Sequence, residues 1–123
     1  MEGASSAFDR GFVVYSEEAK CDLLGLAPET IARCGVVSGA VAQAMAEGAI
    51  AGSKADVAVA ITGFAGRAGE EDEVGLVHFA TCTRDGETAQ REEHFGDRGH
   101  GPIRLAAVDV ALTMLEEALE KLA

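Results

Sequence analysis

The chain has 123 residues, a formal net charge of −11 and 48% hydrophobic residues, with one Tyr and no Trp. This length predicts a single domain over residues 1–123, long enough to bury a core without disulfides or metals. The acidity argues against nucleic acid and anionic membranes as partners, because both are bound through Lys and Arg; a solvated acidic surface explains it equally well.

The first half of the chain predicts a strand followed by three helices. Residues 11–15 are apolar and β-prone, which is typical of a strand. Residues 16–24 begin with a serine cap and two glutamates and end before a glycine, so they predict a helix. A proline opens a short helix over 28–35, and a serine caps a longer one over 38–51.

The second half predicts three strands and a terminal helix. Residues 55–61 are apolar and typical of a buried strand. Residues 74–83 predict a second strand, joined by the turn at 84–86 to a polar edge strand over 87–95. Residues 102–122 carry an apolar face at helical spacing. The order of these elements predicts a mixed sheet with helices packed on it.

A glycine-rich turn follows the buried strand and is the strongest candidate for a ligand site. Its sequence is Thr62-Gly63-Phe64-Ala65-Gly66. Open α/β sheets bind ligands where their strands end, and glycine allows a close approach of the backbone. The alternative is that Thr62 only caps the turn.

Two side chains near the first helix could support chemistry. Lys20 lies about one turn into that helix, where the partial positive charge of the helix N-terminus disfavours an ammonium group. A lysine can assist a hydroxyl nucleophile only if burial or a nearby cation lowers its pKa. The alternative is an exposed ion pair with Glu17. Tyr15 could act beside Lys20, or could be a core aromatic with its hydroxyl satisfied at the sheet edge.

Further polar side chains flank the last loop. Arg98 could form a bidentate interaction with a phosphate, which His94 and His100 could also approach. Alternatively, Arg98 could form an ion pair with Asp97. His78 lies in the middle of a predicted strand, where a core or surface role is favoured over that of a base. No two histidines have the i, i+4 spacing of a helical metal site, so we expect no metal and no cofactor.

The cysteines and the absence of long apolar stretches indicate a cytoplasmic protein. Cys21, Cys34 and Cys82 are scattered and odd in number, which is typical of reduced thiols. No stretch approaches the roughly 20 apolar residues of a membrane helix, and the first residues predict no signal peptide.

Five ordered segments carry a resemblance to a known family and cover nearly the whole chain. They are residues 8–20, Gly35-Val36-Val37-Ser38, residues 62–66, Val74-Gly75-Leu76-Val77 and Gly96-Asp97-Arg98. In this order they resemble the CinA C-terminal domain. The resemblance implies a three-layer α/β/α fold with a mixed sheet, lacking here the family's first strand and helix.

The resemblance also implies an activity. The family deamidates nicotinamide mononucleotide to nicotinic acid mononucleotide and ammonia in bacterial pyridine-nucleotide salvage, by serine chemistry without a metal. Carried onto this chain, Tyr15, Lys20 and Thr62 correspond to catalytic side chains. Gly63 and Gly66 would let the turn approach the substrate.

The family's nucleophilic serine has no counterpart here. It lies in a Glu-Ser-Cys-Thr-Gly-Gly motif at the start of the family's domain, whereas Ser5 and Ser6 stand in what resembles a later loop. We therefore expect little or no turnover from this chain as it stands. It could have a longer native form, pair with itself or a partner, or be a copy that no longer catalyses. The alternative functions are a non-catalytic nucleotide-binding or oligomerisation module and a structural homodimer.

Overall fold

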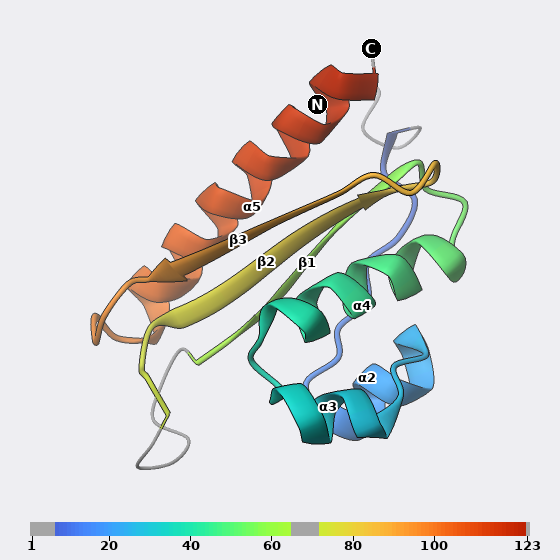
Figure 1. The fold of residues 1–123 in the computed structure, drawn as a ribbon. Coiled ribbons are helices and arrows are strands. Elements are labelled where there is room, and N and C mark those ends of the chain that lie inside the picture. The colour runs from blue at the N-terminus through green and yellow to red at the C-terminus, as the bar shows by residue number, and fades with distance from the viewer. Residues whose placement is uncertain (1–6, 65–71, 123) are drawn as a thin grey trace.

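The computed structural model describes residues 7–64 and 72–122 (Figure 1). Its elements are α2 (Glu17–Leu24), α3 (Pro28–Cys34), α4 (Gly39–Ala51), β1 (Val57–Gly63), β2 (Leu76–Thr83), β3 (Thr88–His94) and α5 (His100–Leu122). Every helix and strand predicted after residue 15 is present, with ends that differ by a few residues.

The three strands form one sheet in the order β1-β2-β3. Both pairs are antiparallel, with Ala60 opposite Ala80 and Ala80 opposite Gln90. The polar strand β3 lies at one edge and is exposed along most of its length, as its sequence predicts. The described strands are antiparallel throughout, so this part of the sheet does not show the mixed pairing that we expected.

Helices cover both faces of the sheet (Figure 1). On one face, α4 packs on β1 and β2, and α2 and α3 pack on α4. The alanines at 42, 46, 60 and 80 are buried in this core, and their small side chains allow helix and sheet to approach closely. On the other face, α5 packs on β1 and β2 around the fully buried Phe79 and Ile103. The three-layer α/β/α architecture is therefore confirmed.

Residues 11–15, predicted as a strand, are not one in the structure. The segment is extended and alternates: Phe12 and Val14 pack against the α4 core, whereas Val13 and Tyr15 are 91% and 98% exposed. A strand needs a neighbour to complete its hydrogen bonds, and no described strand pairs with this segment. The prediction was wrong because the alternation of apolar and exposed residues determines which side chains turn inward, but it does not provide a neighbouring strand for backbone hydrogen bonds.

None of the described helices is long and apolar enough to cross a membrane.

Candidate functional site at the end of β1

Three of the five family-like segments meet where β1 ends. The backbone amide of Phe64 donates to the carbonyl of Leu76 at 2.9 Å, and the amide of Gly75 donates to the carbonyl of Phe64 at 2.7 Å. The amide of Phe95 in turn donates to the carbonyl of Gly75 at 2.9 Å. These bonds hold the glycine turn, the start of β2 and the loop after β3 together at one end of the sheet.

Glycines allow this close approach. Gly75 and Gly96 both have left-handed backbones, with φ values of 90° and 80°. A Cβ atom at Gly75 would lie closer than 3.0 Å to backbone atoms of Gly96. The loop that carries Arg98 is thereby held against β2. Arg98 itself is exposed, and its side chain makes no ion pair with Asp97 in the part of the chain that the structure describes.

Thr62 connects a fourth family-like segment, residues 35–38, to the same end of the sheet. Its side chain is buried, and its hydroxyl donates to the carbonyl of Val36 at 2.8 Å. Val36 precedes α4, which begins after the cap residue Ser38. The N-terminus of α4 therefore opens beside the end of β1, and its partial positive charge favours anions there. Thr62 links two loops of the site rather than capping its own turn.

Replacing Thr62 by valine is expected to destabilise the protein by about 1–3 kcal/mol, because the carbonyl of Val36 would lose its buried partner. Thr62→Ser keeps the hydroxyl and serves as the matched control. Urea unfolding followed by circular dichroism measures both variants. Equal losses of stability in the two would show that the hydroxyl contributes nothing.

The register of the sheet aligns three polar side chains on the face that α4 covers. Thr62 lies opposite His78, and His78 lies opposite Glu92. The Nε2 atom of His78 is 3.8 Å from a carboxylate oxygen of Glu92, and the imidazole is only 14% exposed. A Cβ atom at Gly39, the first residue of α4, would lie 3.8 Å from Nδ1 of His78. The sequence favoured a plain core or surface role for His78; only the strand register could have placed it beside Thr62.

His94 is bound by carboxylates at the same end of the sheet. Its Nδ1 lies 2.5 Å from Glu73 and its Nε2 lies 2.6 Å from Glu92. These hydrogen bonds, that to Glu73 first, raise the pKa of His94 above its ordinary value of 6.5. The two carboxylates favour the charged form of the ring, which can donate from both nitrogens. The structure thus gives His94 two protein partners where we had considered a phosphate.

Stability should depend on pH through His94. A raised pKa in the folded state gives a stabilising contribution that is complete below about pH 6.5 and is lost as pH rises through the folded value. His94→Gln is therefore expected to destabilise the protein at pH 5.5 and to have less effect at pH 9. Thermal unfolding of both proteins across this range measures the difference, and an effect that grows with pH would contradict the assignment.

Lys20 is buried in α2. Its ammonium donates to the carbonyl of Val14 at 3.1 Å, so it fastens the extended segment to the helix. Burial lowers the pKa of Lys20 from 10.5, opposed by the smaller effect of the Glu17 charge. Within the described residues no ion pair joins Lys20 to Glu17, so the structure does not show the exposed ion pair that the sequence left open as an alternative. A buried amine with a lowered pKa can exist partly as the neutral base.

The remaining predicted site residues are Tyr15, Gly63 and Gly66. Tyr15 stands fully exposed just before α2, and no hydrogen bond links its hydroxyl to Lys20 in the described part of the chain. Gly63 is tightly enclosed, since a Cβ atom there would lie 2.8 Å from a methyl group of Val77. Gly66 lies outside the described residues, as do Ser5 and Ser6.

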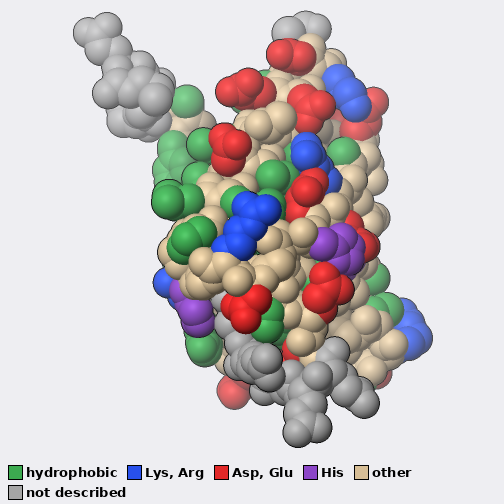
Figure 2. Space-filling view, turned by 90° about the vertical axis from the view of Figure 1, so that its left-hand side faces the viewer, with side chains coloured by type: hydrophobic (Ala, Val, Ile, Leu, Met, Phe, Trp, Pro, Cys, Tyr) green, Lys and Arg blue, Asp and Glu red, His purple; other side chains and the backbone are tan. Residues whose placement is uncertain are grey.

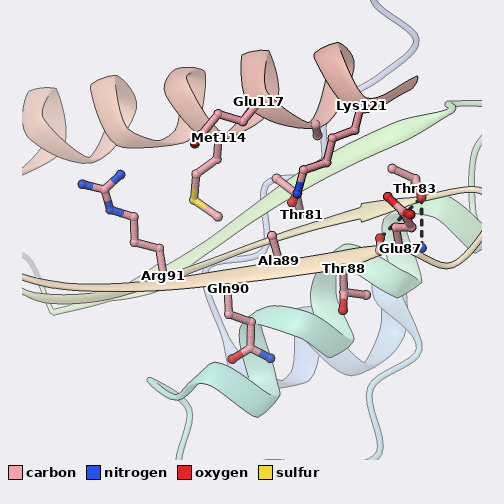
Figure 3. A pocket seen from close by; sticks show the side chains of 11 residues that line it. Thr81, Thr83, Glu87, Thr88, Ala89, Gln90, Arg91, Met114, Glu117 and Lys121 are labelled. Atoms are coloured by element: carbon pink, nitrogen blue, oxygen red, sulfur yellow. Dashed lines mark hydrogen bonds between the residues drawn. The ribbon is translucent and has the colours of Figure 1, made fainter. Parts of the chain in front are cut away.

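A separate cavity of about 300 Å³ lies between β3 and the C-terminal half of α5. Figure 3 shows Met114 and Lys121 of α5 above Thr81 and Ala89 of the sheet. None of the predicted site residues lines it. Among the residues that the structure describes, no group of three His, Cys, Asp or Glu side chains could hold a metal ion.

Comparison with known proteins decides the family. The family model for the CinA C-terminal domain matches residues 1–119. The chain belongs to this family. The nicotinamide-nucleotide amidohydrolase PncC of Escherichia coli (strain K12) is 47% identical over 118 residues, which are 94% of this chain and 70% of that protein. A CinA-like protein of Akkermansia muciniphila is 48% identical over 123 residues, but the match spans 98% of this chain and only 30% of that protein.

Solved CinA-superfamily structures share the fold. The crystal structure of competence/damage inducible protein CihA from Agrobacterium tumefaciens has a TM-score of 0.90 and 47% identity, covering 95% of this chain and 72% of that one. A competence or damage-inducible protein from Enterobacter asburiae gives a TM-score of 0.85 at 36% identity, over 97% of this chain and 75% of its own. The CinA relatives are thus longer than the part that this chain matches.

Proposed function

We propose that this CinA domain supplies part of an amidohydrolase site for nicotinamide mononucleotide. In the reaction, water adds to the carboxamide carbon, the C–N bond breaks, and the nitrogen leaves as ammonia. The products are ammonia and nicotinic acid mononucleotide. The observation that carries the proposal is the buried Lys20, whose lowered pKa suits a base, in a chain 47% identical to a protein with this named activity.

The geometry at the end of β1 suits a nucleotide. The N-terminus of α4 attracts a phosphate, and the exposed guanidinium of Arg98 can pair with its oxygens. The glycine turn at Gly63 brings backbone close to the same place. Thr62 and His78 lie beside this turn, and their polar atoms can form hydrogen bonds with the substrate.

We further propose that the chain alone does not turn over, because none of the serines in the described part of the chain is placed as a nucleophile. In the described part, the hydroxyls of Ser16, Ser38 and Ser53 each accept a hydrogen bond from a nearby backbone amide. They cap helices and turns. The nucleophile would then come from the serine-bearing segment that the family carries at the start of its domain.

A chimera tests this proposal. The serine-bearing N-terminal segment of the Escherichia coli relative is joined to this chain, and nicotinamide mononucleotide is supplied as substrate. We expect ammonia and nicotinic acid mononucleotide in equal amounts, and no product when the serine of the motif is replaced by alanine. A folded chimera that yields neither product would contradict the proposal.

The second candidate is a non-catalytic nucleotide-binding module, favoured by the local capping of every described serine. Calorimetry of this chain with nicotinamide mononucleotide separates the candidates when it is combined with the chimera. Binding by the chain together with an inactive chimera would favour the module. We also propose a cytoplasmic location, for which the three free thiols are suited.

A further inference from the structure

The cavity between β3 and the C-terminal half of α5 exists because α5 covers only part of the sheet. Helix α5 packs on β1 and β2, and within the described residues it makes no close backbone contact with β3. The space left over β3 is the cavity of about 300 Å³. At about 30 Å³ for each water molecule, this volume fits a ligand of roughly ten non-hydrogen atoms. A ligand here is separate from the substrate proposed for the end of β1.

Thr81 gives the cavity a polar floor. Its side chain is only 3% exposed, on β2 opposite Ala89 of β3. In the described part of the chain its hydroxyl makes no hydrogen bond, whereas those of Thr62, Thr83 and Thr113 do. No fully enclosed side-chain nitrogen or oxygen there lacks a partner, so the Thr81 hydroxyl reaches the cavity that Thr81 lines. A buried hydroxyl in this position is stabilised by a ligand that bonds to it.

Both signs of charge border the cavity. Figure 3 shows Glu117 and Lys121 entering from α5 and Arg91 from β3. The Nε atom of Arg91 donates to Glu93 at 2.6 Å. Neither Glu117 nor Lys121 makes an ion pair within the described residues, so a carboxylate and an ammonium one helical turn apart are left for a ligand.

The ligand that suits this border carries both charges. Basic side chains also stand among acidic ones over the face that Figure 2 shows. A plain anion is repelled by the net charge of −11, and a plain cation leaves Lys121 without a partner. Buried Met114 and Ala118 of α5 add an apolar wall, and the flexible thioether of methionine adapts to an aliphatic group.

We propose that this cavity binds a free α-amino acid with an aliphatic side chain, such as leucine. The carboxylate of the amino acid lies between Lys121 and Thr81, which point toward one another in Figure 3. Its ammonium pairs with Glu117, and its side chain packs on Met114 and Ala118. Leucine has about nine non-hydrogen atoms, which the cavity holds. A peptide added as a further strand is disfavoured, because β3 exposes charged side chains along its length.

Methyl NMR of this chain with isotope-labelled methionine methyl groups tests the site, with L-leucine as the probe up to about 10 mM. We expect a saturable shift of the Met114 methyl signal. The Met45 signal is the internal control and should not move, because Met45 is buried in the core on the other face of the sheet. The absence of a saturable shift at Met114, or an equal shift at Met45, would overturn the proposal.

Two analogues of leucine test the requirement for both charges. Isocaproate lacks the ammonium group and isoamylamine lacks the carboxylate, while both keep the aliphatic chain. Each is expected to bind at least about tenfold more weakly than leucine, because one charged group of the cavity stays unpaired. Equal affinity for leucine and either analogue would contradict the assignment of an amino acid.

Variants test the two residues assigned to the carboxylate. Thr81→Val keeps the shape of the side chain and should weaken leucine binding about fivefold without lowering the free energy of unfolding, since no hydrogen bond within the protein is lost. Lys121→Met should weaken it about tenfold or more. The matched control is Lys54→Met, an exposed lysine that does not line the cavity and should leave the affinity unchanged. Unchanged binding by Thr81→Val and Lys121→Met would refute the site.

Discussion

Replacing Lys20 by methionine in the serine-bearing chimera is expected to lower ammonia release by about 100-fold or more, while the protein stays folded. The methionine keeps an unbranched chain in the buried position but removes the amine that would accept a proton from the nucleophile. Burial disfavours the charged form of Lys20 and so lowers its pKa, and the exchange also removes the cost of burying that form. The hydrogen bond to Val14 is lost in return.

The control for this experiment is Lys54→Met, since Lys54 is exposed between α4 and β1. It should keep full turnover. The rates are compared with thermal unfolding of each variant at the same pH. If Lys20→Met lost activity only in proportion to a loss of folded protein, or kept its activity, the assignment of Lys20 as the base would be contradicted.

The largest effect on stability is expected from Gly75→Ala, at about 3 kcal/mol. A methyl group at Gly75 would clash with the backbone of Gly96, and it would also force an L-residue into a left-handed conformation with φ of 90°. The substitution would separate the start of β2 from the loop after β3, the two segments that the amide of Phe95 joins.

Gly86→Ala separates the two causes. Gly86 has a similar φ of 96° in the hairpin turn, but a Cβ atom there meets nothing within 4 Å. This variant should lose only about 1 kcal/mol, from the backbone conformation alone. Denaturant unfolding measures both variants. Equal losses would mean that the contact between Gly75 and Gly96 costs nothing to disrupt.

The helices could be predicted from the sequence because their ends are fixed by local chemistry. Ser16 and Ser38 each accept a hydrogen bond from a backbone amide three residues on, at 3.0 and 3.2 Å. Gly25 ends α2 in the left-handed conformation with φ of 71°. Such interactions involve residues close together in the chain, so the sequence alone contains them.

The segment at residues 11–15 could not be predicted in the same way. Its alternation correctly indicates that Phe12 and Val14 face the core. Whether it joins the sheet depends on a neighbouring strand, which is a property of the whole fold. The same limit applies to the mixed sheet, since the direction of strand pairing is set by connections far apart in the chain.

The site was only partly accessible from the sequence. The sequence singled out Lys20 and the glycine turn, but the burial of Lys20 and the contacts of the turn with the Gly75 and Gly96 segments are known only from the structure. His78 and Glu92 were missed because their places beside Thr62 follow from strand register. Register is determined by packing across the sheet, which a single sequence does not state.

Ammonia release from nicotinamide mononucleotide by this 123-residue chain, measured beside the serine-bearing chimera, tests the central claim most directly. We expect no ammonia above the buffer control from the chain and clear turnover from the chimera. Turnover by the chain alone that disappears on Lys20→Met would contradict the claim, because the buried lysine would then work without the serine of the family motif.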